Sequence, residues 1–155
     1  MTERYAEVAD RFGTPVYVYD GDLLRQRYEA LRGRLHPDVD VFYSAKANPN
    51  VSVCAVLRSL GAGLEVSSMA ELVTARRAGV AARDIIFLGP GKSLEELRAC
   101  AEAGVHAVVC ESLDELELID GLRVPGRVNV MLRVNPSFTA RGARLSMGGK
   151  PRQFG

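Results

Sequence analysis

A strand, a turn and an amphipathic helix recur in this order from residue 39 onward, and this repeat constrains the fold more than any other feature. Short apolar runs typical of strands occupy residues 39–45, 63–67, 84–88, 106–110 and 127–134. Their starts lie about 21 to 24 residues apart, and the runs are bounded by turn residues. Amphipathic helices are predicted between them, over residues 52–60, 69–78, 94–103 and 113–120. Strands that alternate with helices of this length pair in parallel through right-handed crossovers, so the sequence predicts an α/β fold of about five βα units.

The helix ends carry recognisable start and stop signals. Ser93 with Glu96, and Ser112 with Glu115, have the spacing of a capping box. A glycine follows each of the four helices and suits a left-handed backbone at the helix end, at Gly61, Gly79, Gly104 and Gly121.

The first 36 residues differ from the repeat. Residues 14–20, with the sequence Thr-Pro-Val-Tyr-Val-Tyr-Asp, predict a strand, and residues 22–35 predict a helix with one apolar face. We therefore divide the chain into an N-terminal strand-helix segment, 1–36, and a βα-repeat domain, 37–155. The Gly/Arg/Pro-rich tail from 135 to 155 has no clear period and is predicted to be a loop.

Five βα units fit either an open doubly wound sheet or part of an eight-stranded barrel. The Gly-x-Gly-x-x-Gly fingerprint of dinucleotide-binding sheets does not follow the first strand. Regular spacing, together with a lysine placed where barrel enzymes have their active sites, favours a partial (β/α)8 TIM barrel. A complete barrel takes about 250 residues. We therefore expect the 155 residues to form an incomplete barrel, the N-terminal part of a longer protein.

Lys46 lies directly after the apolar strand run 41–45 and before the turn Asn48-Pro49-Asn50. An amine held in a low-dielectric pocket at a strand end loses its proton more easily and can attack an aldehyde. Only three of the 20 basic Lys and Arg residues are lysines, and arginine cannot play this role. The alternative is that Lys46 is a solvated residue at the start of a loop.

Other charged residues follow neighbouring strands. Glu65 ends the second strand and could balance the charge of an amine, although it could also be simply solvated. Glu71, in the first turn of the next helix, is better explained by interaction with the helix dipole. Arg133 on the fifth strand is predicted to face an anion or a phenolic oxygen in the barrel mouth, or alternatively to form a structural ion pair.

The segment Gly89-Pro90-Gly91-Lys92-Ser93 looks like a phosphate-binding loop. It is not a Walker A motif, because Ile86 stands where that motif needs glycine. We interpret it as a tight turn that leads into a capped helix, which leaves Lys92 as a minor rival to Lys46.

Several classes of function are disfavoured. The net charge of +1 argues against a nucleic-acid or membrane surface. Cys54, Cys100 and Cys110 are widely spaced and odd in number, which indicates reduced, buried thiols, and the two isolated histidines do not form a metal site. The first residues do not have the layout of a signal peptide, so we expect a cytoplasmic protein.

Taken in order, these segments resemble the fold-type III pyridoxal-phosphate decarboxylases, the family of diaminopimelate and ornithine decarboxylases. The resemblance covers nearly the whole chain. It rests on Gly13–Asp20, Phe42–Asn48, Gly61–Leu72, Gly89–Lys92, Glu111-Ser112 and Leu132–Pro136.

The resemblance implies an alanine racemase-like barrel that binds pyridoxal 5'-phosphate and removes CO₂ from an L-amino acid. Lys46 would form the internal aldimine, Glu65 would lie near that lysine and the pyridine ring, and Arg133 would lie near the phenolic oxygen. The family acts as homodimers, and its other cofactor-binding residues would come later in the chain. We therefore expect the 155 residues alone to be inactive and, with open sheet edges, prone to association.

Two departures from the family pattern affect the substrate. Most relatives have Asp where this chain has Glu65. The segment 144–155 has neither the His nor the Thr-Gly usual in diaminopimelate decarboxylases, and is more similar to relatives in secondary metabolism, one of which acts on an amino acid tethered to a carrier protein. Three alternatives stay open: a non-enzymatic pyridoxal-phosphate homeostasis barrel, an amino-acid racemase of the same fold, and a sugar-phosphate barrel that binds no pyridoxal.

Overall fold

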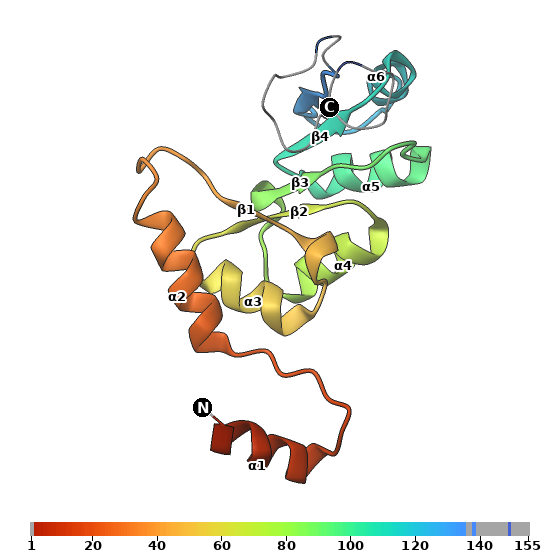
Figure 1. Ribbon diagram of the computed structural model, residues 1–155. Helices are drawn as coiled ribbons and strands as arrows, with labels where there is room; N and C mark the ends of the chain where they lie inside the picture. The colour runs from red at the N-terminus through yellow and green to blue at the C-terminus, as the bar shows by residue number, and fades with distance from the viewer. Residues whose placement is uncertain (1, 136–137, 139–148, 150–155) are drawn as a thin grey trace.

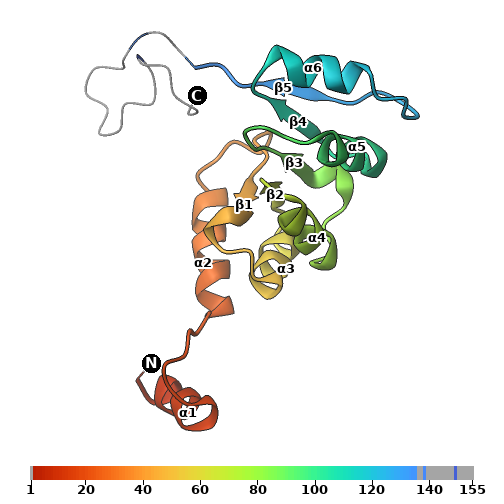
Figure 2. The same cartoon turned by 90° about the vertical axis from the view of Figure 1, so that its right-hand side faces the viewer.

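The computed structural model describes residues 2–135, 138 and 149, and shows five parallel strands in the order β1-β2-β3-β4-β5. The strands are β1 (Phe42–Ser44), β2 (Gly63–Val66), β3 (Ile85–Phe87), β4 (Ala107–Cys110) and β5 (Val130–Leu132). Between them lie the helices α3 (Val51–Ser59), α4 (Met69–Arg77), α5 (Leu94–Ala103) and α6 (Leu113–Asp120). Figures 1 and 2 show these helices on one side of the sheet, as right-handed crossovers require. The predicted parallel βα repeat is confirmed.

The core lies between the sheet and these helices. Leu64 and Val66 of β2, Ile85 and Phe87 of β3, and Val108 of β4 are at most 1% exposed and belong to one apolar cluster. The α3, α4 and α5 helices add Cys54, Leu72, Ala75, Leu97 and Cys100 to it. Successive strand residues point to opposite faces, so the residues between these core positions face the other side of the sheet. Glu65 lies on that second face, which in a barrel is the inside.

Gly63 allows β1 and β2 to come together closely. A Cβ atom at this position would lie 2.6 Å from the Phe42 ring and 2.8 Å from the carbonyl oxygen of Asp84. No side chain fits such a space, so the glycine is required by packing and not by backbone torsion.

The predicted helix ends are mostly confirmed. Both hydrogen bonds of the Ser93–Glu96 capping box are present, and α5 and α6 begin and end at the predicted residues. Gly61, Gly79 and Gly104 have φ values of 98°, 82° and 67°. Gly121 is different: its φ of −71° is right-handed, so the prediction of a left-handed end to α6 is wrong.

The N-terminal segment departs from the sequence prediction. Residues 14–20 form extended chain without strand pairing, and an unpredicted helix, α1 (Thr2–Phe12), precedes them. The predicted strand is wrong because β-formers need a neighbouring strand to pair with, and here Tyr17 is 89% exposed. The predicted helix 22–35 is present as α2 (Gly21–Arg32), which packs beside α3 (Figure 1). The domain boundary near residue 36 stays a prediction.

Both margins of the sheet are open in the described part of the chain, because β1 pairs only with β2 and β5 only with β4. Most of the predicted tail loop, with Lys150, lies outside the described residues. No described helix is long and apolar enough to cross a membrane.

Candidate active site

A cavity of about 670 Å³ lies at the carboxyl ends of the strands. Each of the five strands, or the turn that follows it, contributes to the lining. The contributing residues are Lys46 after β1, Glu65 from β2, Ser67 after β2, Gly89 and Pro90 after β3, Val109 from β4 and Arg133 after β5. This is the end of a (β/α)8 barrel at which active sites form. All three predicted site residues therefore lie around one cavity.

Lys46 lies in the single 3-10 turn Ala45–Ala47 that follows β1 directly. Its neighbour Ala45 is fully buried, whereas Lys46 itself is exposed. Among the described residues, no hydrogen bond or ion pair involves the Lys46 side chain, so its amine is available to a ligand in the cavity. The expectation of a sheltered, low-dielectric amine is not met in the described part of the chain, where Lys46 is exposed and β1 forms an open margin of the sheet.

Glu65 is half-buried on the inner face of β2. Its Oε1 accepts a hydrogen bond of 3.3 Å from the hydroxyl of Ser44, the residue paired with it across β1 and β2. The carboxylate is thus oriented by its neighbour and not simply solvated.

Arg133 is held at the opposite side of the cavity. Its Nη1 lies 3.1 Å from Oε1 of Glu111, and its backbone N–H donates to Cys110 O at 2.9 Å. The Nε atom is buried and has no hydrogen-bond partner among the described residues, and neither has the hydroxyl of Ser67. The sequence prediction left open an ion pair or a ligand contact, and the geometry allows both at once. Arg133 and Ser67 both line the cavity, and a guanidinium and a hydroxyl residue there suit a ligand that carries oxygen atoms.

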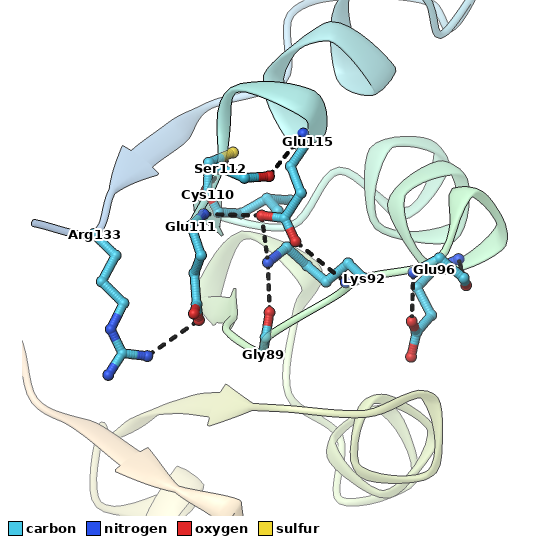
Figure 3. A network of polar contacts seen from close by, with 10 residues as sticks. Gly89, Lys92, Glu96, Cys110, Glu111, Ser112, Glu115 and Arg133 are labelled. Carbon is cyan, nitrogen blue, oxygen red and sulfur yellow. Dashed lines mark hydrogen bonds and ion pairs between the residues drawn. The ribbon is translucent and has the colours of Figure 1, made fainter. Parts of the chain in front are cut away.

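Lys92 does not share this cavity, which removes it as a rival to Lys46. Its side chain is 1% exposed, and Nζ lies 2.6 Å from Gly89 O and 2.9 Å from Oε2 of Glu115 (Figure 3). The Gly89–Ser93 segment is therefore a structural turn, as the sequence predicted. The role of Glu115 was missed, since the sequence suggested only a capping residue for α6. One sequence feature could have indicated a special role for Lys92, because lysines are rare in this chain, whose basic residues are mostly arginine.

The electrostatics of Glu115 fit this ion pair. Burial alone would raise the pKa of its carboxyl, but hydrogen bonds from the Glu111 backbone and from Lys92 hold the pKa below its ordinary value. The carboxylate is therefore ionised at neutral pH and charge-paired with the Lys92 ammonium.

The turn after β2 is built in a related way. Ser68 caps α4 by accepting from the Glu71 N–H, and Oε2 of Glu71 accepts from the Ser67 N–H at 2.7 Å. Glu71 thus fixes the backbone of a cavity residue and also lies at the favourable end of the helix dipole. The neighbouring turn comes very close: a Cβ at Gly89 would lie 3.1 Å from Ser67 O.

The three cysteines are free and buried, as predicted. Burial raises the pKa of the Cys100 thiol to about 12, and burial also raises the pKa values of Cys54 and Cys110. Protonated thiols are poor nucleophiles. No group of side chains able to hold a metal ion occurs in the part of the chain that the structure describes.

A parallel βα wall with a lysine, a glutamate and an arginine around one cavity defines an incomplete barrel of the TIM type with an amine-bearing site. Residues 22–155 match the family model of the pyridoxal-binding domain of pyridoxal-dependent decarboxylases. The chain belongs to this family, whose cofactor is pyridoxal phosphate.

The chain is similar to several characterised members of the family. It is 41% identical to an L-glutamyl-[BtrI acyl-carrier protein] decarboxylase of Niallia circulans, over 94% of this chain and 34% of that protein. It is 39% identical to a diaminopimelate decarboxylase of Pseudomonas fluorescens, over 96% and 37% of the two chains. The crystal structure of diaminopimelate decarboxylase from Helicobacter pylori complexed with L-lysine superposes with a TM-score of 0.84 at 29% identity, covering 97% of this chain and 39% of that one. The chain therefore spans little more than a third of the length of these relatives.

The described residues fit pyridoxal phosphate. The cavity is lined by Lys46, whose amine has no partner among the described residues and suits the aldehyde, and by the guanidinium of Arg133 and the hydroxyl residue Ser67, which suit its oxygen atoms. A carboxylate, Glu65, lies on the same wall.

Proposed function

We propose that this chain supplies the cofactor-binding wall of a pyridoxal-phosphate-dependent L-amino-acid decarboxylase, with Lys46 as the amine that binds the cofactor covalently. The observation that carries the proposal is the contrast between its two described lysines. Lys46 has no partner among the described residues and lines the cavity with Glu65 and Arg133, whereas Lys92 is buried in an ion pair.

The roles of the other residues follow from their contacts. Glu65, oriented by Ser44, places a negative charge that stabilises a protonated nitrogen in the cavity. Arg133, held by Glu111, supplies a guanidinium cation beside the cavity that can bind a ligand oxygen. The bound cofactor supplies an electron sink for the carbanion left when CO₂ departs, and the protein supplies orientation and charge.

For the substrate, we propose an L-amino acid attached to a carrier protein. The similarity to the L-glutamyl carrier-protein decarboxylase supports this choice. So does the segment 144–155, which departs from the diaminopimelate decarboxylase pattern. We further propose that the whole protein acts as a homodimer.

Covalent trapping tests the central claim. The 155-residue chain is incubated with pyridoxal phosphate, reduced with borohydride and mapped by peptide mass spectrometry. We expect the pyridoxyl group on Lys46, at cofactor concentrations well above those that saturate a closed site, because the amine is exposed. Lys46→Arg keeps the charge but cannot form the bond, so it serves as the control. A pyridoxyl group that forms equally on Lys46→Arg would contradict the assignment.

The substrate proposal has a separate test. The protein that carries this domain is given an L-glutamyl group on a carrier protein, free L-glutamate or diaminopimelate, and CO₂ release is measured. Release from the carrier-bound substrate alone is expected, and release mainly from diaminopimelate would overturn the choice of substrate.

A further inference from the structure

One polar network joins three separate βα turns on the Arg133 side of the cavity (Figure 3). It comprises the turn after β3 (Gly89–Lys92), the turn after β4 with the start of α6, and the end of β5. At its centre is the carboxylate of Glu115, which arises from α6 and is buried.

Glu115 binds two of these turns by their backbones. Its Oε1 accepts from the Lys92 N–H at 3.2 Å, and its Oε2 accepts from the Glu111 N–H at 2.9 Å. The Lys92 ammonium closes the arrangement, because Nζ pairs with Oε2 of Glu115 and also donates to Gly89 O.

Each of the two turns then delivers a group to the cavity. Gly89 and Pro90 form part of its wall directly. Glu111, fixed through its backbone N–H, holds the Arg133 guanidinium through its side chain at 3.1 Å. Glu115 is therefore linked to Arg133 through a single intervening residue, Glu111.

We propose that Glu115 and Lys92 are positioning residues: their buried pair sets the place of Arg133 and of the Gly89-Pro90 wall, and thereby the affinity for the cofactor. The inference rests on the proposed function, since it assigns a consequence to cofactor binding at this cavity. Neither residue touches the cavity itself.

The chain contains a matched control. Glu96 makes the same kind of helix-start contact as Glu115, accepting from the Ser93 N–H at 2.9 Å, but its contacts stay within one capping box at the start of α5. Glu96→Gln and Glu115→Gln thus make the same chemical change, but only Glu115→Gln alters contacts that join the turns around the cavity.

The experiment measures the pyridoxal phosphate concentration that gives half-maximal borohydride trapping on Lys46, together with the unfolding temperature. We expect Glu115→Gln to raise this concentration about tenfold, the equivalent of losing one charge-assisted hydrogen bond to the ligand, while Glu96→Gln leaves it within about twofold of wild type.

A double variant separates positioning from folding. Lys92→Met with Glu115→Leu replaces the pair by apolar side chains of similar volume, so that no buried charge is left without its partner. It cannot restore the hydrogen bonds to Glu111 and to the backbone of Lys92. We expect the double variant to unfold at a higher temperature than the single variant Lys92→Met, which leaves a buried charge unpaired, and still to need about tenfold more cofactor than wild type.

The outcomes are distinct. Suppose that Lys46 of the wild type is trapped and that the double variant binds the cofactor as tightly as the wild type. The pair would then only stabilise the fold, which overturns the inference and leaves the proposed function intact. Equal effects of Glu115→Gln and Glu96→Gln would also overturn it. Absence of trapping on wild-type Lys46 would overturn the proposed function, and the inference with it.

Discussion

Two lysines follow parallel strands at the same end of the sheet, and their surroundings are opposite. Lys46, after β1, is exposed and has no partner among the described residues. Lys92, in the turn after β3, is 1% exposed and holds both Glu115 and the Gly89 carbonyl. The comparison shows that a place at a strand end does not make a lysine a nucleophile. The neighbouring groups determine the role of each lysine. They leave the Lys46 amine available to a ligand, whereas they bind the Lys92 amine as a structural cation.

The largest expected effect of this contrast is on stability. Lys92→Met leaves the Glu115 carboxylate buried without its counter-charge and should lower the free energy of unfolding by about 3–5 kcal/mol. Lys46→Met removes an exposed side chain and should change it by less than about 0.5 kcal/mol. Urea denaturation of the two variants measures both values. Similar losses would mean that the two lysines are not used differently.

Acid should reduce the contribution of the Lys92–Glu115 ion pair to the stability of the fold. The pKa of Glu115 is lowered in the folded chain, so its contribution to stability is present above the ordinary value of 4.5 and is lost as the pH falls through the lower folded value. We expect the unfolding temperature of wild type to fall more steeply below pH 4.5 than that of the Lys92→Met/Glu115→Leu double variant. Parallel curves for the two proteins would rule out this contribution.

A smaller effect is expected at the helix that follows Lys46. The Asn50 side chain caps α3 by accepting from the Ser52 N–H at 2.9 Å. Asn50→Ala should therefore lower the free energy of unfolding by about 1 kcal/mol. Ser52→Ala, two residues further on inside α3, keeps the backbone N–H that Asn50 caps; it is the control and should cost less than about 0.5 kcal/mol. If Asn50→Ala lowered the free energy of unfolding as much as Lys92→Met does, the turns after β1 and β3 would not differ in their contribution to stability.

Features set by neighbouring residues were predictable from the sequence. The limits of α5 and α6 follow from serine caps and from apolar spacing, both of which act within one helical turn. Placing Lys46, Glu65 and Arg133 at one cavity needed only the rule that parallel strands end at the same edge of a sheet.

Features that depend on distant partners were not predictable in the same way. The Lys92–Glu115 pair joins residues 23 positions apart, and nothing local distinguishes this Glu from an ordinary capping residue. The run 14–20 has the composition of a strand but has no strand beside it to pair with among the described residues. The exposure of Lys46 depends on how much barrel wall surrounds it, which its own segment does not encode.

The contact between Gly89 and Ser67 affects how this site can change. Because a Cβ at Gly89 would lie only 3.1 Å from the backbone oxygen of Ser67, main-chain atoms limit the space between the two turns. Trimming side chains there cannot bring the turns closer, and any larger residue at position 89 would force them apart. A bulkier ligand would find room more easily on the β5 side of the cavity, which is lined by the larger apolar residues Met131, Leu132 and Val134, whose side chains substitution can shorten.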